Sequence, residues 1–224
     1  MIELFADVTC PFTHVGLRRV VERRAELRST LPIRVKAWPL ELVNGEALTG
    51  RFVAEEVAAL RSEAAPDLFS GLDPAGFPTT TLPALALTSL ATARSLELGE
   101  VVALDVRDAV FERGLDVGDT DVLGAIAAAH GLALADTDPD AVIAEYEEGQ
   151  RLGVVGSPYF IVKGVGYFCP ALDIRRVDGH FQIQSAPAAF DAFMVAAFGA
   201  SAPGASEAGA SAPGASAAEG AEHG

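Results

Sequence analysis

The chain opens with a short apolar run from Ile2 to Ala6, which leads through a polar turn into a helical pattern beginning at Pro11. Proline is tolerated in the first turn of a helix because its missing N–H would have no partner there. We therefore predict a buried strand over 2–6 and a helix over about 11–28. The segment 33–38 then alternates between apolar and polar residues up to Pro39. This pattern predicts a second strand and completes a β-α-β unit.

The stretch 39–151 shows helical patterns and no convincing strand. Its prolines, glycines and the candidate N-cap Asp119 delimit the helices. We predict these over about 51–64, 83–98, 100–113, 120–129 and 139–152. The link 70–81 is rich in glycine and proline, which predicts a loop that could line a cleft.

Strand character returns at 158–162, and a glycine turn then leads to Tyr167-Phe168, so we predict a hairpin followed by a last helix over about 187–198. The hexapeptide SAPGAS occurs twice near the C-terminus. Such a composition cannot bury a core, and we predict a disordered tail over 200–224. The expected organisation is an α/β domain formed by 1–38 and 152–199, with an all-helical insertion, 39–151, between its halves.

Composition narrows the function classes. Lys and Arg number 16 against 31 Asp and Glu, for a net charge of −15, which disfavours nucleic acid and anionic membranes as partners. An uninterrupted run of about 20 apolar residues is missing, so we expect no membrane span. The start of the chain lacks a signal-peptide pattern, and we expect a cytoplasmic protein. The four histidines are scattered, so we expect no metal site.

Two cysteines occur in the chain, and Cys10 lies directly before the first predicted helix. Free N–H groups and the helix dipole stabilise a thiolate at such a position, so we expect a pKa lowered from about 8.5 into the range of about 3.5–7.5. The alternative is a small buried apolar residue. Three residues further on stands Thr13, whose hydroxyl could donate to the thiolate or serve the backbone of the helix start.

Three features, taken together, resemble the DsbA-like branch of the thioredoxin superfamily over about 2–199. The first is Asp7 followed by Cys10-Pro11, which is similar to the family's C-P-x-C motif except that Thr13 replaces the second cysteine. The second is the segment 109–123, similar to cytosolic relatives of DsbA and to 2-hydroxychromene-2-carboxylate isomerases. The third is the segment 155–162, similar to the family's cis-proline loop.

A finer resemblance lies in the segment 163–170, which is similar to a hairpin of the actinobacterial mycothiol-dependent nitroreductases, themselves DsbA-like proteins. The family resemblance implies an α/β, thioredoxin-like fold (β-α-β … β-β-α) with a large helical insertion. It also implies that Pro158 is cis, and that the N–H and C=O groups of Ser157 pair with a substrate beside Cys10.

The remaining candidate residues each keep two interpretations. Pro11 and Phe12 would border the substrate, and Phe12 and Trp38 would form an apolar rim or simply pack in the core. His14 would assist proton transfer or the thiolate, or it is a solvated or core histidine. Cys169 would be a distant resolving thiol, or a buried core cysteine.

The leading functional hypothesis is a DsbA-like thiol–disulfide oxidoreductase acting through the single thiol of Cys10. No covalently bound cofactor is expected. A small thiol, mycothiol or glutathione, would resolve the mixed disulfide that Cys10 forms with a disulfide or electrophilic substrate. One alternative is a thiol-dependent isomerase or transferase, similar to the hydroxychromene carboxylate isomerases and kappa-class glutathione transferases. Another is a redox-inactive binding module, and a homodimer is left open.

Overall fold

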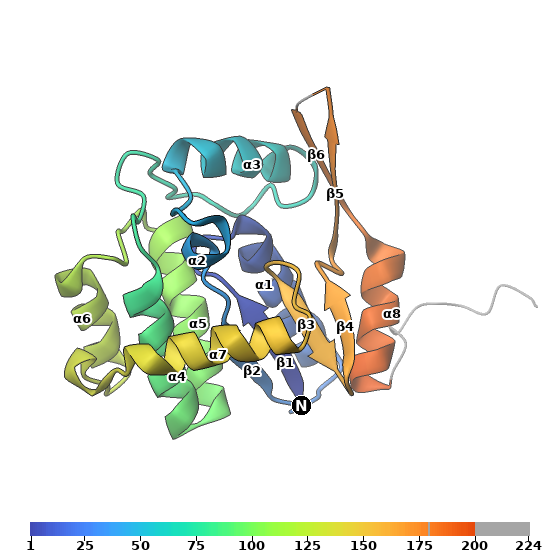
Figure 1. Ribbon diagram of the computed structural model, residues 1–224. Coiled ribbons are helices and arrows are strands. Elements are labelled where there is room, and N and C mark those ends of the chain that lie inside the picture. The colour runs from blue at the N-terminus through green and yellow to red at the C-terminus, as the bar shows by residue number, and fades with distance from the viewer. Residues whose placement is uncertain (179, 200–224) are drawn as a thin grey trace, which may run out of the picture.

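The computed structural model describes residues 1–178 and 180–199, and a four-stranded sheet lies at its centre (Figure 1). The strand order is β2-β1-β3-β4. Strand β1 (Ile2–Ala6) pairs in parallel with β2 (Ile33–Ala37), and helix α1 (Pro11–Glu26) connects them. Strand β3 (Tyr159–Val162) runs antiparallel to β1 and forms a hairpin with β4 (Val165–Phe168). The predicted β-α-β unit and the predicted hairpin are both confirmed.

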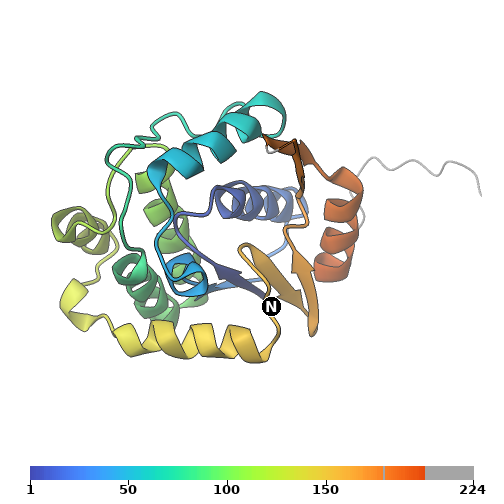
Figure 2. The ribbon, with the colours of Figure 1, turned by 45° about the horizontal axis from the view of Figure 1, so that its top comes forward.

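Helices cover both faces of this sheet because side chains alternate along each strand. Leu4 of β1 packs with α1 and with the last helix, α8 (Pro187–Phe198), on one face. Its neighbour Phe5 points the other way and packs with Trp38 and with Tyr146 of α7 (Pro139–Arg151). Figure 2 shows the sheet lying between α1 and α7. Cys10, the N-cap of α1, lies just beyond the carboxyl end of the central strand β1.

All the helices between β2 and β3 lie in the stretch where the sequence predicts helices and no strand. They are α2 (Leu40–Asn44), α3 (Gly50–Glu63), α4 (Leu82–Arg94), α5 (Leu96–Phe111), α6 (Thr120–Ala129), the 3-10 turn Leu134–Asp136 and α7. The short α2 and the 3-10 turn were not predicted. Within the described residues, no helix is long and apolar enough to cross a membrane.

The boundary between α4 and α5 differs from the prediction, which placed the break at Gly99. The chain breaks at Ser95 instead, where the backbone is extended and the side chain accepts a hydrogen bond from the N–H of Leu98. Gly99 lies inside α5 directly against Thr92 of α4, where a Cβ atom would collide. Its missing side chain thus permits close helix packing rather than ending a helix.

A second, two-stranded sheet was missed by the sequence interpretation. It consists of β5 (Leu172–Val177) and β6 (His180–Ser185), paired antiparallel. The signals were present: apolar residues alternate in both segments, and the dipeptide Asp178-Gly179 favours a tight hairpin turn. This hairpin and α3 lie side by side at the same end of the molecule (Figure 1). The predicted tail, 200–224, lies outside the described residues.

Candidate functional site

The loop before Cys10 is held by the buried side chain of Asp7. Its carboxylate accepts hydrogen bonds from the backbone and hydroxyl of Thr9 (2.7 and 2.6 Å), from the N–H of Leu40 (2.9 Å) and from the hydroxyl of Thr81 (3.0 Å). Burial raises the pKa of Asp7, and these hydrogen bonds act in the opposite direction. Asp7 therefore ties the strand end to α2 and α4 and fixes where α1 begins.

The Ser157–Pro158 peptide bond is cis, as predicted, and it lies against the start of α1. The Cys10 thiol donates a hydrogen bond to the carbonyl oxygen of Ser157 at 3.1 Å. The Ser157 hydroxyl oxygen accepts from the N–H of Asp7 at 2.9 Å. Cys10 and the residue before the cis-proline are thus brought together, although the Ser157 carbonyl is occupied by the cysteine itself.

Thr13 lies beneath this contact and is fully buried. Its hydroxyl is 2.8 Å from the Ser157 hydroxyl, with either group able to donate. The Thr13 side chain also lowers the pKa of Cys10 through a hydrogen bond to its sulfur. Thr13 therefore supports both Ser157 and Cys10 from inside the protein, and it does not line the cavity described next.

A cavity of about 290 Å³ opens beside Cys10. Cys10 and Pro11, from the start of α1, and Ser157 form its floor. The walls are mostly apolar, and Glu56 is the only one of them with an ionisable side chain. The wall residues are Phe12, Leu40, Leu48, Phe52, Glu56, Phe168 and Ile174. Phe12 thus borders the site as expected. Trp38 does not, because its ring packs against Phe5 and Tyr146 on the other face of the sheet.

The expectation of a lowered pKa for Cys10 is wrong for this structure. The residue is only 2 % exposed. Burial raises the pKa of its thiol from 9.0 to about 11, against the smaller lowering effects of Thr13 and Ser157. The buried guanidinium of Arg107 donates a hydrogen bond to the Asp7 carbonyl at 3.1 Å. Its positive charge would attract the negative charge of a Cys10 thiolate. The resting thiol is nevertheless protonated at neutral pH.

Glu56 of α3 is a site residue that the sequence interpretation missed. Its side chain lines the Cys10 cavity and is 5 % exposed. Burial raises its pKa from 4.5 to about 8, with partial opposition from the positive charge of Arg176. A signal was available, because Glu56 falls on the buried stripe that Val53, Val57 and Leu60 define along the helix. A carboxyl group on an apolar stripe marks a buried polar position.

His14 follows Thr13 but turns into the core. Its ring lies between Phe69 and Phe111, with centroids 5.2 and 4.9 Å away, and its Nε2 atom is 2.8 Å from Oε1 of Glu112. Burial lowers the pKa of His14 to about 4. His14 does not line the Cys10 cavity, so this geometry matches the core-histidine alternative.

Cys169 is buried immediately beyond β4. Its N–H donates to the carbonyl of Pro158 at 3.0 Å, so it is next to the cis-proline loop. Both cysteines are free thiols. Burial raises the pKa of the Cys169 thiol, and a negative charge on Cys10 would raise it further. Cys169 is not among the lining residues of the Cys10 cavity. Its burial, with 4 % of the residue exposed, matches the core-cysteine interpretation, and the alternative of a resolving thiol stays a prediction.

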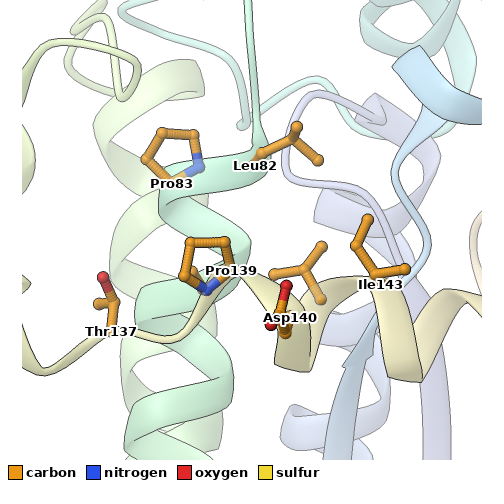
Figure 3. Close-up of a pocket in the computed structure, with 8 residues that line it drawn as sticks. Leu82, Pro83, Thr137, Pro139, Asp140 and Ile143 are labelled. Carbon is orange, nitrogen blue, oxygen red and sulfur yellow. The ribbon is translucent and has the colours of Figure 1, made fainter.

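A second cavity, of about 240 Å³, lies where the starts of α4 and α7 meet (Figure 3). Its walls are mainly apolar, with Leu82 and Pro83 on one side and Pro139 and Ile143 on the other. The polar groups that border it are Thr137 and Asp140, and it contains no thiol. Among residues 1–178 and 180–199, no group of three or more His, Cys, Asp or Glu side chains could hold a metal ion.

A parallel β-α-β unit, an antiparallel hairpin entered through a cis-proline and a cysteine at the start of α1 define a thioredoxin-fold protein with a helical insertion. Residues 1–182 match the model of the DSBA-like thioredoxin domain. The chain therefore belongs to this family, and the predicted fold is confirmed. Among the curated proteins, none matches the sequence.

Solved structures with the same fold share little sequence with the chain. A probable DsbA oxidoreductase from Streptomyces coelicolor is 21 % identical, with 87 % of this chain and 88 % of that one covered and a TM-score of 0.62. A 2-hydroxychromene-2-carboxylate isomerase is 11 % identical, with 75 % of this chain and 87 % of that one covered and a TM-score of 0.58. The cytosolic disulfide reductase DsbM from Pseudomonas aeruginosa, solved with GSH, is 14 % identical, with 74 % of this chain and 87 % of that one covered and a TM-score of 0.53. At these identities the likeness shows the fold.

Proposed function

We propose that this protein exchanges its Cys10 thiol with disulfides of small molecules and works with a single thiol. One observation carries the proposal: the Cys10 sulfur is 3.1 Å from the carbonyl that precedes a cis-proline, at the floor of a cavity. A disulfide that enters this cavity meets the sulfur directly. Membership of the DSBA-like family supports the same chemistry.

The reaction forms a mixed disulfide between Cys10 and half of the substrate. Thr13 stands where a second cysteine would resolve that bond. A second small thiol therefore attacks the mixed disulfide and releases free Cys10. The solved complex of DsbM with GSH supports a small thiol as partner.

The lining of the cavity favours one kind of small thiol. It contains Glu56 and no lysine or arginine, so a thiol with carboxylates finds no cation there. Mycothiol has no carboxylate and fits this lining better than glutathione does. Cytoplasmic location and a homodimer stay predictions.

Mass spectrometry of the intact protein tests the proposal. Reduced protein is incubated with glutathione disulfide and, separately, with the uncharged bis(2-hydroxyethyl) disulfide. We expect one added thiol per chain in wild type and in Cys169→Ser, none in Cys10→Ser, and loss of the added mass when a free thiol is supplied. Absence of any mixed disulfide on wild-type Cys10 would reject the proposal.

A specific observation also favours the isomerase or transferase alternative. Because burial keeps Cys10 protonated, its S–H group, which donates to the Ser157 carbonyl in this structure, can turn to donate a hydrogen bond to the sulfur of a bound thiol instead of attacking it. Cys10→Ser would then retain thiol-dependent turnover, since a hydroxyl also donates. A pure binding module would bind its ligand equally well after Cys10 is alkylated.

A further inference from the structure

The buried thiol of Cys10 raises a question of proton transfer, which rests on the function proposed above. When the sulfur attacks a disulfide, one S–S bond breaks, one S–S bond forms, and the departing half leaves as a thiolate. The proton of Cys10 must go from one sulfur to the other for the step to balance. Burial raises the pKa of Cys10 to about 11, so this proton is still on the thiol when the substrate arrives.

Three titratable side chains near the start of α1 are candidates to carry this proton. Asp7 is fully engaged, because its carboxylate accepts four hydrogen bonds, and it does not line the cavity. His14 is bound to Glu112 inside an aromatic cluster and does not line it either. Glu56 does line it, together with Cys10 and Ser157.

The carboxyl group of Glu56 is also free to act. Within the described residues it makes no hydrogen bond and no ion pair, although the residue is 5 % exposed. Its charge raises the pKa of Cys10, so the two groups interact across the cavity. The cavity that both side chains line, at about 290 Å³, is large enough to hold water. Glu56 belongs to α3, which lies across the end of the molecule beside the β5–β6 hairpin (Figure 1).

We propose that Glu56 carries the proton in the exchange step. Its carboxylate takes the proton from Cys10, directly or through one water molecule, as the sulfur attacks, and then gives that proton to the departing thiolate. No external oxidant or reductant is required. A group that accepts and releases a proton works best with a pKa near neutrality. Burial brings the pKa of Glu56 to about 8.

The charges that act on Glu56 come from the elements packed around it. Arg176 of β5 favours the carboxylate and is itself held over the ring of Phe181, 4.6 Å from its centroid. The titratable group of β6, His180, is exposed at the end of the hairpin. The charged side chains of α1 nearest its start are engaged elsewhere: His14 with Glu112, Arg18 with Asp108, and Arg19 with the carbonyls of Ala64 and Ala171.

The test compares the pH dependence of Cys10 reactions in wild type and in Glu56→Gln, which keeps the size of the side chain. Bis(2-hydroxyethyl) disulfide reports the whole exchange. Iodoacetamide, whose leaving group needs no proton, reports the first transfer alone. Peptide mass spectrometry follows Cys10 separately from Cys169. We expect a rise in the wild-type rates centred near pH 8 that Glu56→Gln lacks. The variant should exchange at least about tenfold more slowly at pH 7.

A purely electrostatic role for Glu56 predicts the opposite result. Removing its negative charge would lower the pKa of Cys10, and Glu56→Gln would then react faster. A faster or unchanged variant overturns the proposal. Glu55→Gln, an exposed position on the same helix, is the matched control and should behave as wild type. Acetate should partly restore the rate of Glu56→Ala, which provides a second test if Glu56→Gln folds poorly.

The outcomes separate the two proposals. If wild type forms the mixed disulfide and Glu56→Gln forms it at the same rate with the same pH profile, the exchange function stands and the proton-carrier role fails. If wild-type Cys10 forms no mixed disulfide with either disulfide, the function itself fails.

Discussion

The burial of Glu56 predicts a pH-dependent stability that is independent of any reaction. The perturbation is Glu56→Gln, which removes the titratable proton and retains the shape. The pKa of Glu56 is raised from 4.5 to about 8 by burial. A group with a raised pKa in the folded state stabilises the protein below its unfolded pKa, and this stability is lost as the pH rises through the folded pKa. We therefore expect wild type to lose stability between about pH 5 and pH 9.

The magnitude follows from the difference between the two pKa values. At about 1.36 kcal/mol per pKa unit, a rise from 4.5 to about 8 corresponds to about 5 kcal/mol over the full range. Most of this, about 4 kcal/mol, falls between pH 5 and pH 9. The side chain is 5 % exposed, so little of this energy is screened by solvent. In a domain with a total stability of about 5–15 kcal/mol, such a change is readily measured.

Urea denaturation at several pH values, followed by the fluorescence of the buried Trp38 under reducing conditions, measures the effect. We expect wild type and Glu56→Gln to have similar free energies of unfolding near pH 5 and the variant to be more stable near pH 9. Glu55→Gln, at an exposed position, should parallel wild type. Curves for wild type and Glu56→Gln that run parallel from pH 5 to pH 9 would refute the reasoning.

Three further predictions concern buried positions of the fold, two in the first turn of α1 and one on the other face of the sheet. Thr13→Val keeps the shape of the side chain but removes the hydrogen-bond partner of the Ser157 hydroxyl, so the free energy of unfolding should fall by about 1–3 kcal/mol. Because the Thr13 side chain also lowers the pKa of Cys10, the alkylation of Cys10 should shift to higher pH in the variant. The pKa of His14 is lowered from 6.5 to about 4, so the imidazole resists protonation in the folded protein. As the pH falls from about 6.5 to about 4, the free energy of unfolding of wild type should therefore drop by about 3 kcal/mol relative to that of His14→Gln. A difference between the two proteins that stays constant with pH in urea titrations would contradict this. Gly149→Ala would place a methyl group 2.7 Å from the buried indole ring of Trp38 and should lower the stability measured by thermal unfolding by about 1–3 kcal/mol. The control Gly124→Ala, also in a helix, would place its methyl group 3.8 Å from the nearest atom and should raise the stability by about 0.5–1 kcal/mol.

Features that depend on short stretches of sequence were predicted well. The strand before Cys10, the proline at the start of α1 and the last helix follow from local hydrophobic patterns and from the restricted φ of proline. The cis geometry of Pro158 came instead from the family resemblance. The end of α4 was misplaced because Gly99 satisfies a packing requirement between two helices, which a search for helix-ending glycines cannot recognise.

The electrostatics of the site could not be predicted in this way. The position of Cys10 at the start of α1 argued for an ionised thiol, but the surroundings of the thiol include Phe52 of α3 and Ile174 of β5, which line the cavity beside it. Both are distant in sequence, and their approach depends on a hairpin that the interpretation missed. Groups at the start of α1, such as Thr13, lower the pKa of Cys10, but burial by the tertiary structure raises it by a larger amount.

The walls of the cavity beside Cys10 are assembled in an order set by translation. The cysteine leaves the ribosome long before α3, and α3 long before Ile174 of the β5–β6 hairpin. For most of the elongation of the chain its thiol is therefore an ordinary solvent-exposed one, open to any cellular disulfide. A small thiol attached at this stage would lie in the cavity of about 290 Å³ that α3 and the hairpin later wall in. On the proposed function, the chain can therefore finish folding around the mixed disulfide, and a second small thiol would then release Cys10 in the folded protein.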